Sequence, residues 1–287
     1  MPIHDQSYQH WNGTFRKHEL SWWIIAKQGL RVIVHRKMLM LFILAPAVIQ
    51  FFIYGGIIYG VNTYGAMLNL SIINPKFFFD FIMRQTFFIA LMCVFAGSGL
   101  IANDLRNNAL QLYFSKPIKR LDYIVGKLLT IFILLGFITL IPGILLFTEN
   151  AVISQDLTFL IEDFWLIGSI TLFSLIIVIT TGFMILAFSS TTRNNRYAAI
   201  GFIAILIGTP IFSGLLKEVL NLKWASFISY WSNMYTVGSR IFGLPPVVSA
   251  FWKGTDYWYW SIVIILAIIA TSILVIMKRV RGVEIIK

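Results

Sequence analysis

The sequence has little charge and almost no cysteine. Of its 287 residues, 12% are charged and 58% are hydrophobic, and the mean hydropathy is +0.81. Soluble domains carry about 25% charged residues, so a single soluble core is excluded and a polytopic membrane protein is indicated. The only cysteine, Cys93, lies inside an apolar run. An intrachain disulfide is therefore excluded, and a buried, unreactive thiol is favoured over a nucleophile.

Motifs of enzymes and pumps are also missing. The nearest approach to a P-loop, Gly126-Lys127-Leu128, lacks the preceding glycine and the hydroxyl residue, so the chain does not bind ATP in that way. No metal-ligand spacing occurs, and no Asp, Glu or His lies near the centre of a predicted span, which argues against a metalloenzyme and an ion-coupled carrier. We therefore expect no catalytic residue, metal or cofactor in this chain.

Six apolar segments each have the roughly 20 residues that a helix needs to cross a bilayer. They lie near Met38 to Gly60, Met83 to Ala102, Tyr123 to Phe147, Phe164 to Ser189, Tyr197 to Leu216 and Tyr257 to Met277. The sequence thus predicts an all-α polytopic membrane protein. Residues 1–37 would form a cytoplasmic N-terminus with an interfacial helix, and residues 38–287 a six-span domain.

Basic residues concentrate on one side of this predicted topology. With the N-terminus inside, 17 of the 23 Lys and Arg residues fall on the inner side, and the formal net charge is +11. The positive-inside rule therefore predicts that both termini are cytoplasmic. A high pI with this distribution indicates anionic membrane lipids and a cytosolic partner, and argues against nucleic acid.

Residues 14–37 alternate bulky apolar residues with cations. One helical stripe contains Trp22, Ile25, Gly29 and Ile33, and another contains Lys27, Arg31 and His35. This pattern predicts a helix that lies in the inner membrane interface, with Trp22 and Trp23 near the acyl boundary and Lys27 and Arg31 toward the headgroups.

A polar and basic segment, Asn103 to Asp122, separates the second and third apolar runs; we call it the junction segment. Leu105, Ala109 and Leu112 recur at helical spacing on one side, and Asp104, Asn108 and Gln111 on another. This spacing predicts a short amphipathic helix over about 103–115 that ends at Lys116-Pro117. Two hypotheses stay open: a loop whose charges only fix topology, or a docking helix for a soluble partner that moves both adjoining spans.

The connection between the fifth and sixth spans is long and half apolar. It predicts one or two short helices, over about 220–246, that dip into the outer leaflet. Polar residues in the spans are candidates for lining a transport path, although a bond within its own helix bundle is the favoured interpretation of each: Gln50, Tyr54, Ser98, Thr209 and Ser213.

The junction segment resembles the second-to-third-span segment of the type-2 ABC exporter permeases, which have the type V exporter fold. In that family an acidic residue is followed by a short helix, then by Pro-Ile/Val-x-Arg, and then by Gly-Lys at the start of the third span. Here these are Asp104, Pro117-Ile118-Lys119-Arg120 and Gly126-Lys127. One departure is Asn107-Asn108, where many relatives have a Glu-Gly-Thr-like stretch. The six spans and the flanking helices extend the resemblance over most of the chain.

The resemblance implies the permease subunit of an ATP-driven exporter in a bacterial-type plasma (inner) membrane. It implies two cytosolic ABC ATPase subunits, which hold the ATP and Mg, and a second permease copy that is expected to be identical. The short helix after the second span would dock in a groove of the ATPase. The residues that this assigns to coupling are Asp104, Arg106, Asn107, Asn108, Ala109, Gln111 and Leu112. The alternative is a channel or membrane scaffold that recruits a cytosolic partner without ATP-driven transport.

Overall fold

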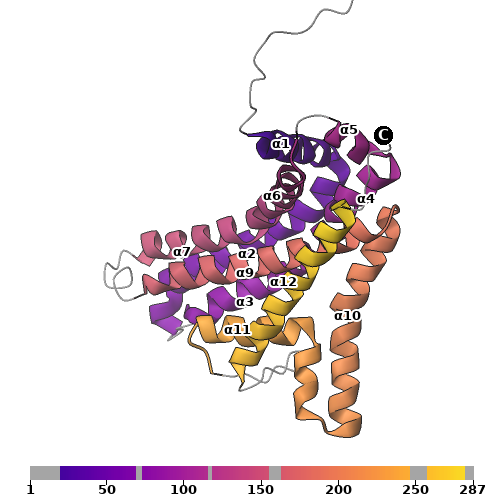
Figure 1. The fold of residues 1–287 in the computed structure, drawn as a ribbon. Helices are drawn as coiled ribbons and strands as arrows, with labels where there is room; N and C mark the ends of the chain where they lie inside the picture. The colour runs from indigo at the N-terminus through magenta and orange to yellow at the C-terminus, as the bar shows by residue number, and fades with distance from the viewer. Residues whose placement is uncertain (1–19, 69–72, 116–117, 155–162, 246–256, 282–287) are drawn as a thin grey trace, which may run out of the picture.

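The computed structural model describes residues 20–68, 73–115, 118–154, 163–245 and 257–281 (Figure 1). Within these ranges every regular element is a helix. Six helical segments of the described chain are long and apolar enough to cross a membrane. The prediction of an all-α protein with six helices suited to cross a membrane is therefore confirmed for the described residues.

The helical elements follow one another with short connections. In chain order they are α1 (Ser21–Val34), α2 (Lys37–Leu68), α3 (Pro75–Met92), the π-helical turn η1 (Cys93–Gly97), α4 (Gly99–Arg106), α5 (Ala109–Phe114), α6 (Arg120–Ile138), α7 (Leu140–Ser154), α9 (Trp165–Thr191), α10 (Asn195–Leu220), the 3₁₀ helix η2 (Lys223–Ile228), α11 (Tyr230–Ile241) and α12 (Trp258–Arg281). The six spans are α2, α3–η1–α4, α6–α7, α9, α10 and α12.

Several spans are longer than the sequence predicted, and α2 continues past Gly60 to Leu68. The second begins at Pro75, not near Met83, because the Asn74 side chain accepts a hydrogen bond from the Phe77 N–H and a proline at the first helical position suits a helix start. The third continues past its predicted end at Phe147 to Ser154, so that Glu149 belongs to α7.

The core is built around α9, which packs against α12, α6, α10, α4 and α7. Aromatic rings fill the space between α3, α9 and the end of α11: the Phe79 ring centroid lies 5.6 Å from that of Phe173 and 5.7 Å from that of Phe242. Gly238 permits this packing, because a Cβ atom there would lie 2.4 Å from the Phe173 ring. α11 can therefore approach α9 closely.

The predicted outer helices between spans five and six correspond to η2 and α11. Every residue from Tyr230 to Ser239 is buried, so α11 packs inside the helical bundle on all its sides. The Ser229 side chain caps α11 by accepting a hydrogen bond from the Ser232 N–H. That this region enters the outer leaflet stays a prediction.

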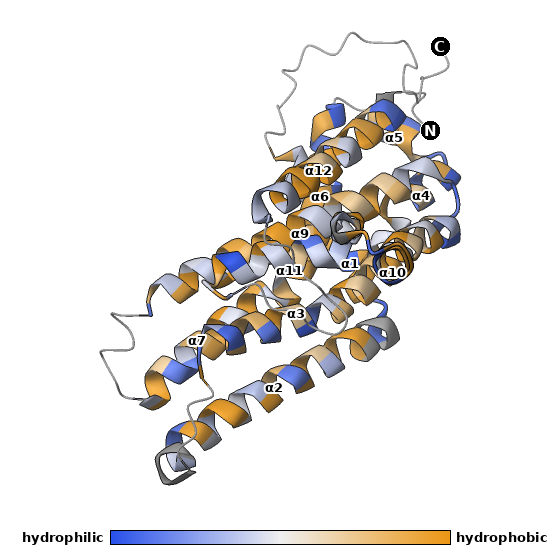
Figure 2. Cartoon of the chain, turned by 90° about the horizontal axis from the view of Figure 1, so that it is seen from below, coloured by the Kyte–Doolittle hydropathy of each residue, from blue (hydrophilic) through white to orange (hydrophobic). Residues whose placement is uncertain are grey.

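α2 and α10 lie at the periphery of the fold. In the most apolar stretches of α2, α10 and α12 only 28%, 17% and 22% of residues are buried, whereas α9 reaches 61%. Figure 2 shows α2 at one edge of the molecule, with apolar residues along its length, and α10 projects from the bundle in Figure 1. α2, α10 and α12 therefore leave apolar surface for lipid or for another subunit to cover.

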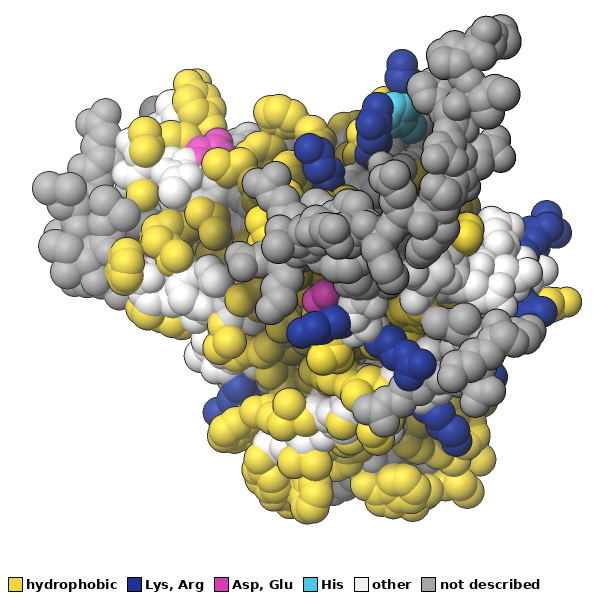
Figure 3. All heavy atoms as spheres, turned by 45° about the horizontal axis from the view of Figure 1, so that its top comes forward, with side chains coloured by type: hydrophobic (Ala, Val, Ile, Leu, Met, Phe, Trp, Pro, Cys, Tyr) yellow, Lys and Arg dark blue, Asp and Glu magenta, His cyan; other side chains and the backbone are white. Residues whose placement is uncertain are grey.

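α1, α4, α5 and the start of α6 meet at one end of the bundle, near the C-terminal end of α12 (Figure 1). On the face at this end, Lys and Arg side chains are far more prominent than acidic ones (Figure 3). The junction segment therefore lies at the basic end of the described fold.

Candidate functional site

The junction segment is bent where the sequence predicted a continuous helix over 103–115. α4 ends when the Asn107 N–H bonds to the Asn103 carbonyl, and α5 begins when the Gln111 N–H bonds to the Asn108 carbonyl. Between them Asn108 has left-handed dihedral angles, with φ at 51° and ψ at 25°. Asparagine tolerates this conformation better than most residues. The single-helix prediction is wrong, and the reason is local to this Asn pair.

Asp104 ties the end of α4 to the first turns of α6. Its carboxylate lies 2.7 Å from Lys127 Nζ and accepts a hydrogen bond of 2.8 Å from the Tyr123 hydroxyl. The side chains of Lys127 and Asp104 are only 9% and 17% exposed. Tyr123 and Lys127 are four residues apart and share one face of α6. Charged hydrogen bonds are strengthened in such surroundings, so this contact fixes the second span to the third.

Gly126, beside Lys127, allows α1 to cross α6 at close range. A Cβ atom on Gly126 would lie 2.8 Å from Ile25 Cβ and 2.8 Å from the Trp22 carbonyl oxygen. One on Gly29 would lie 2.7 Å from the Thr130 hydroxyl. Small residues on both helices therefore bring the two backbones together.

The two stripes predicted for the N-terminal helix occupy different environments. Ile25 and Ile33 are buried, whereas Lys27 and Arg31 are exposed. The apolar stripe thus contacts α6 where lipid was expected, and of the two tryptophans Trp23 is the more exposed, at 43%. The placement of α1 in a membrane interface stays a prediction.

Aromatic side chains hold α5 on the start of α6. The Tyr123 ring centroid lies 5.3 Å from that of Tyr113 and 6.0 Å from that of Phe114. The Arg120 guanidinium lies 5.9 Å from the Phe114 ring. Burial, with a smaller contribution from the Asp104 charge, raises the pKa of Tyr113, so its hydroxyl stays neutral at physiological pH.

The residues predicted for coupling divide into anchored and exposed ones. Asp104 faces α6 and Ala109 is half-buried. The others are exposed: Arg106, Asn107, Asn108, Gln111 and Leu112. Leu112 is 70% exposed and Leu110 is the buried leucine of α5, so the predicted stripe of Leu105, Ala109 and Leu112 does not form one face. The bend at Asn108 rotates α5 relative to α4.

Sequence reasoning missed the anchors of this site, namely Tyr113, Phe114 and Tyr123 as ring contacts and Lys127 as the partner of Asp104. The sequence does contain a signal for the ion pair. An acidic residue at the end of one apolar run and a Tyr-x-x-x-Lys pattern at the start of the next favour an ion pair between adjacent helix ends.

The residues predicted to line a path do not come together. Tyr54 packs on Phe77 and Phe81, with centroid distances of 4.9 and 5.1 Å. Three others bond within the bundle: the Ser98 carbonyl accepts from the Ser189 hydroxyl, Ser213 donates to the Ala225 carbonyl, and Thr209 accepts from the Tyr230 N–H. Gln50 lies on α2 with Tyr54, and its side-chain nitrogen is buried without a hydrogen-bond partner among the described residues. None of them lines either of two cavities in the described part of the chain, the one at the end of α4 or the one between α9, α11 and α12.

The described part of the chain contains no group of three His, Cys, Asp or Glu residues that could hold a metal ion. Comparison of the chain with family models and with curated proteins found no match. The features that bear on function are therefore the junction segment and the helices that surround it.

Proposed function

We propose that this chain is the membrane-spanning permease subunit of an ATP-binding-cassette exporter. A separate cytosolic ATPase subunit, which holds the ATP and Mg, would dock on the exposed α5. The observation that carries this proposal is the pairing of Asp104 with Lys127 at 2.7 Å, which joins the ends of two apolar spans directly behind α5, a short helix with Gln111 and Leu112 exposed.

The contacts of α5 suit the transmission of force to two spans at once. A displacement of α5 reaches α4 through the bend at Asn107 and Asn108. It reaches α6 through the rings of Tyr113 and Phe114 on Tyr123. A segment that served only to fix topology would need its charges, but it would have no use for this aromatic and ionic attachment.

The second span contains an element that could absorb such a displacement. The π-helical turn η1 interrupts it at Cys93–Gly97, and single π turns inside helices often accompany functional sites. A Cβ atom on Gly97 would lie 2.9 Å from the Ile185 side chain of α9, so this turn packs directly against the central helix. Movement of α4 would therefore be transmitted to α9 through this packing contact.

The partners and the location follow from the same proposal. A chain without a nucleotide-binding motif needs two ATPase subunits to supply the energy. The exposed apolar faces of α2 and α10 would be covered by lipid and by a second, identical permease copy. The basic end with the junction segment would face the cytoplasm of a bacterial-type plasma membrane, with both termini inside.

Affinity purification of the tagged full-length chain from its native membrane tests the proposal. We expect a P-loop ATPase to co-purify in stoichiometric amount. Leu112→Asp should abolish this co-purification, because Leu112 is 70% exposed on α5 and its replacement disturbs the docking surface without disturbing the core.

Leu121→Asp is the matched control, since Leu121 is 61% exposed in the first turn of α6 and the chemical change is the same. This variant should retain the ATPase and the normal membrane yield. If the wild-type chain recruits a cytosolic protein that is not an ATPase, or no protein, the exporter proposal is wrong and the channel or scaffold alternative is supported.

A further inference from the structure

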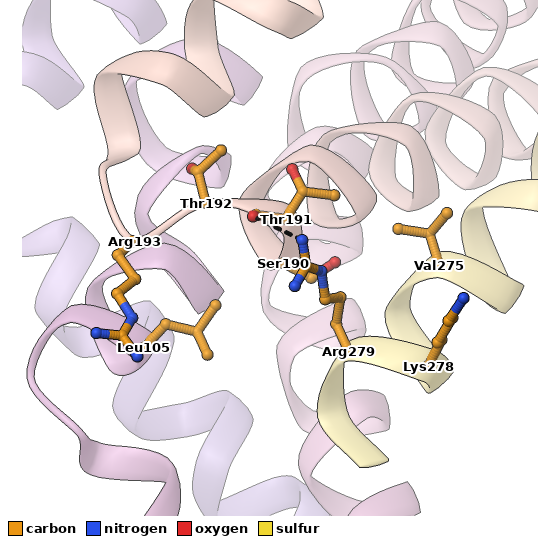
Figure 4. Close-up of a pocket in the computed structure, with 8 residues that line it drawn as sticks. All are labelled: Leu105, Ser190, Thr191, Thr192, Arg193, Val275, Lys278 and Arg279. Atoms are coloured by element: carbon orange, nitrogen blue, oxygen red, sulfur yellow. Dashed lines mark hydrogen bonds between the residues drawn. The ribbon is translucent and has the colours of Figure 1, made fainter. Parts of the chain in front are cut away.

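A cavity of about 710 Å³ opens at the basic end of the fold, where α4, the turn between α9 and α10, and the last turns of α12 meet. Figure 4 shows the side chains around it: Leu105, Ser190, Thr191, Thr192, Arg193, Val275, Lys278 and Arg279. Three separate elements thus contribute to this one cavity, and it is distinct from the contact between Asp104 and Lys127.

The described lining of this cavity is cationic and contains no acidic side chain. The nearest carboxylate along α4, that of Asp104, is already held by Lys127 and Tyr123. Arg279 makes one long hydrogen bond, of 3.4 Å, to the Thr191 carbonyl (Figure 4). The positive charges around the cavity are therefore not balanced by a described neighbour, and an anion is the complementary ligand.

The position of a cation at the C-terminal end of a helix explains two of these three charges but not the third. Lys278 and Arg279 lie in the last turn of α12, where a helix favours cations. Arg193 instead lies two residues before the start of α10, where the helix favours an anion. A phosphate in the cavity would be attracted by all three cations and would accept charged hydrogen bonds from those that reach it.

The surroundings of the cavity favour a lipid over a free ion. A stripe of exposed small or apolar residues runs along α12 and ends at Lys278; it contains Val263, Leu266, Ala267, Ala270 and Leu274. From Val263 to Lys278 the helix rises about 22 Å, more than the roughly 15 Å of hydrocarbon in one leaflet. An acyl chain can lie along this stripe while its headgroup reaches the cavity, beside the apolar walls of Leu105 and Val275.

We propose that this cavity binds the phosphate headgroup of an anionic phospholipid, with an acyl chain along α12. The lipid would contact Leu105, the residue next to Asp104, and would hold α4 and α12 together at the basic end. This site does not depend on whether the chain belongs to an exporter.

Native mass spectrometry of the full-length chain in detergent, titrated with dioleoyl phosphatidylglycerol, tests the site. We expect one phosphatidylglycerol to be retained, and phosphatidylcholine to bind more weakly. The variant Arg193→Gln/Lys278→Gln/Arg279→Gln should lose at least about tenfold in phosphatidylglycerol affinity, because each cation near an anionic lipid contributes to binding. Val275→Trp should weaken binding similarly, because it fills the cavity while leaving every charge in place.

The matched control, Arg36→Gln/Lys37→Gln/Lys119→Gln, removes the same charge from three exposed positions beside α1 and α6. It should leave retention of the single lipid unchanged. Equal losses in the control and in the cavity variant, or wild-type affinity in Val275→Trp, would mean that only diffuse surface charge attracts the lipid, and the site would be wrong. Displacement of phosphatidylglycerol by millimolar inorganic phosphate would assign the cavity to a free anion and overturn the lipid proposal.

Discussion

The contact between Asp104 and Lys127 makes the most demanding prediction. Asp104→Asn keeps the shape of the side chain and can still accept from the Tyr123 hydroxyl, but it leaves the Lys127 ammonium unpaired. Because that side chain is only 9% exposed, water cannot replace the lost carboxylate. The substitution should therefore destabilise the docking of α4 on α6.

The size of the effect follows from the burial of the pair. Removing one partner of a buried ion pair costs about 3–5 kcal/mol, and we expect about 3 kcal/mol because Asp104 is 17% exposed. Lys127→Met should cost less, since an Asp at 17% exposure is partly hydrated. The double variant Asp104→Asn/Lys127→Met leaves no unpaired charge and should be close to the wild type.

Thermal unfolding of the four proteins in one detergent measures these differences. A loss of about 3 kcal/mol corresponds to a fall in Tm of roughly 6–12 °C for a chain of this size. The control is Asp122→Asn, which makes the same change at a half-exposed position in the first turn of α6. Its expected cost is no more than about 1 kcal/mol.

The double-mutant cycle decides whether the pair acts as a unit. We expect the two single losses to be non-additive, with an interaction energy of about 2 kcal/mol or more. Additive losses, or equal Tm values for Asp104→Asn and Asp122→Asn, would refute the reasoning. The second and third spans would then not be tied together at this point, and the observation that carries the proposed function would be lost.

Three further outcomes test other parts of the fold. With the buried Cys93 replaced by Ala, cysteines introduced at Ser115 and Ser154 should be labelled from opposite sides of the membrane; labelling from one side contradicts the topology. Asn108→Gly should be tolerated, whereas Asn108→Val should lose about 1–2 kcal/mol by calorimetry, since φ is 51° there. Gly126→Ala should lower the free energy of unfolding by about 1–3 kcal/mol through overpacking, seen as a lower Tm and as faster proteolysis of α1. An unchanged Tm would contradict the close crossing of α1 and α6.

Composition and periodicity determined the class of this protein and the approximate positions of its six long apolar helices. The apolar runs, their lengths and the placement of the cations are local properties, so they predict six spans without knowledge of packing. Even the early start of the second span was readable in Asn74-Pro75, a cap followed by a residue suited to the first helical position. The two stripes of α1 were likewise readable, because helical spacing alone separates buried Ile25 from exposed Lys27.

Tertiary structure decided what each polar residue does. Asp104 and Lys127 are 23 positions apart, and only the packing of α4 on α6 brings them within 2.7 Å. The bend at Asn108 separates side chains that ideal helical spacing would align. Ser213 and Thr209 bond to the segment that follows α10 because that segment folds back onto the helix. Periodicity assigns a residue to a face of its own helix, but the partner opposite that face is set by helices that are distant in the sequence.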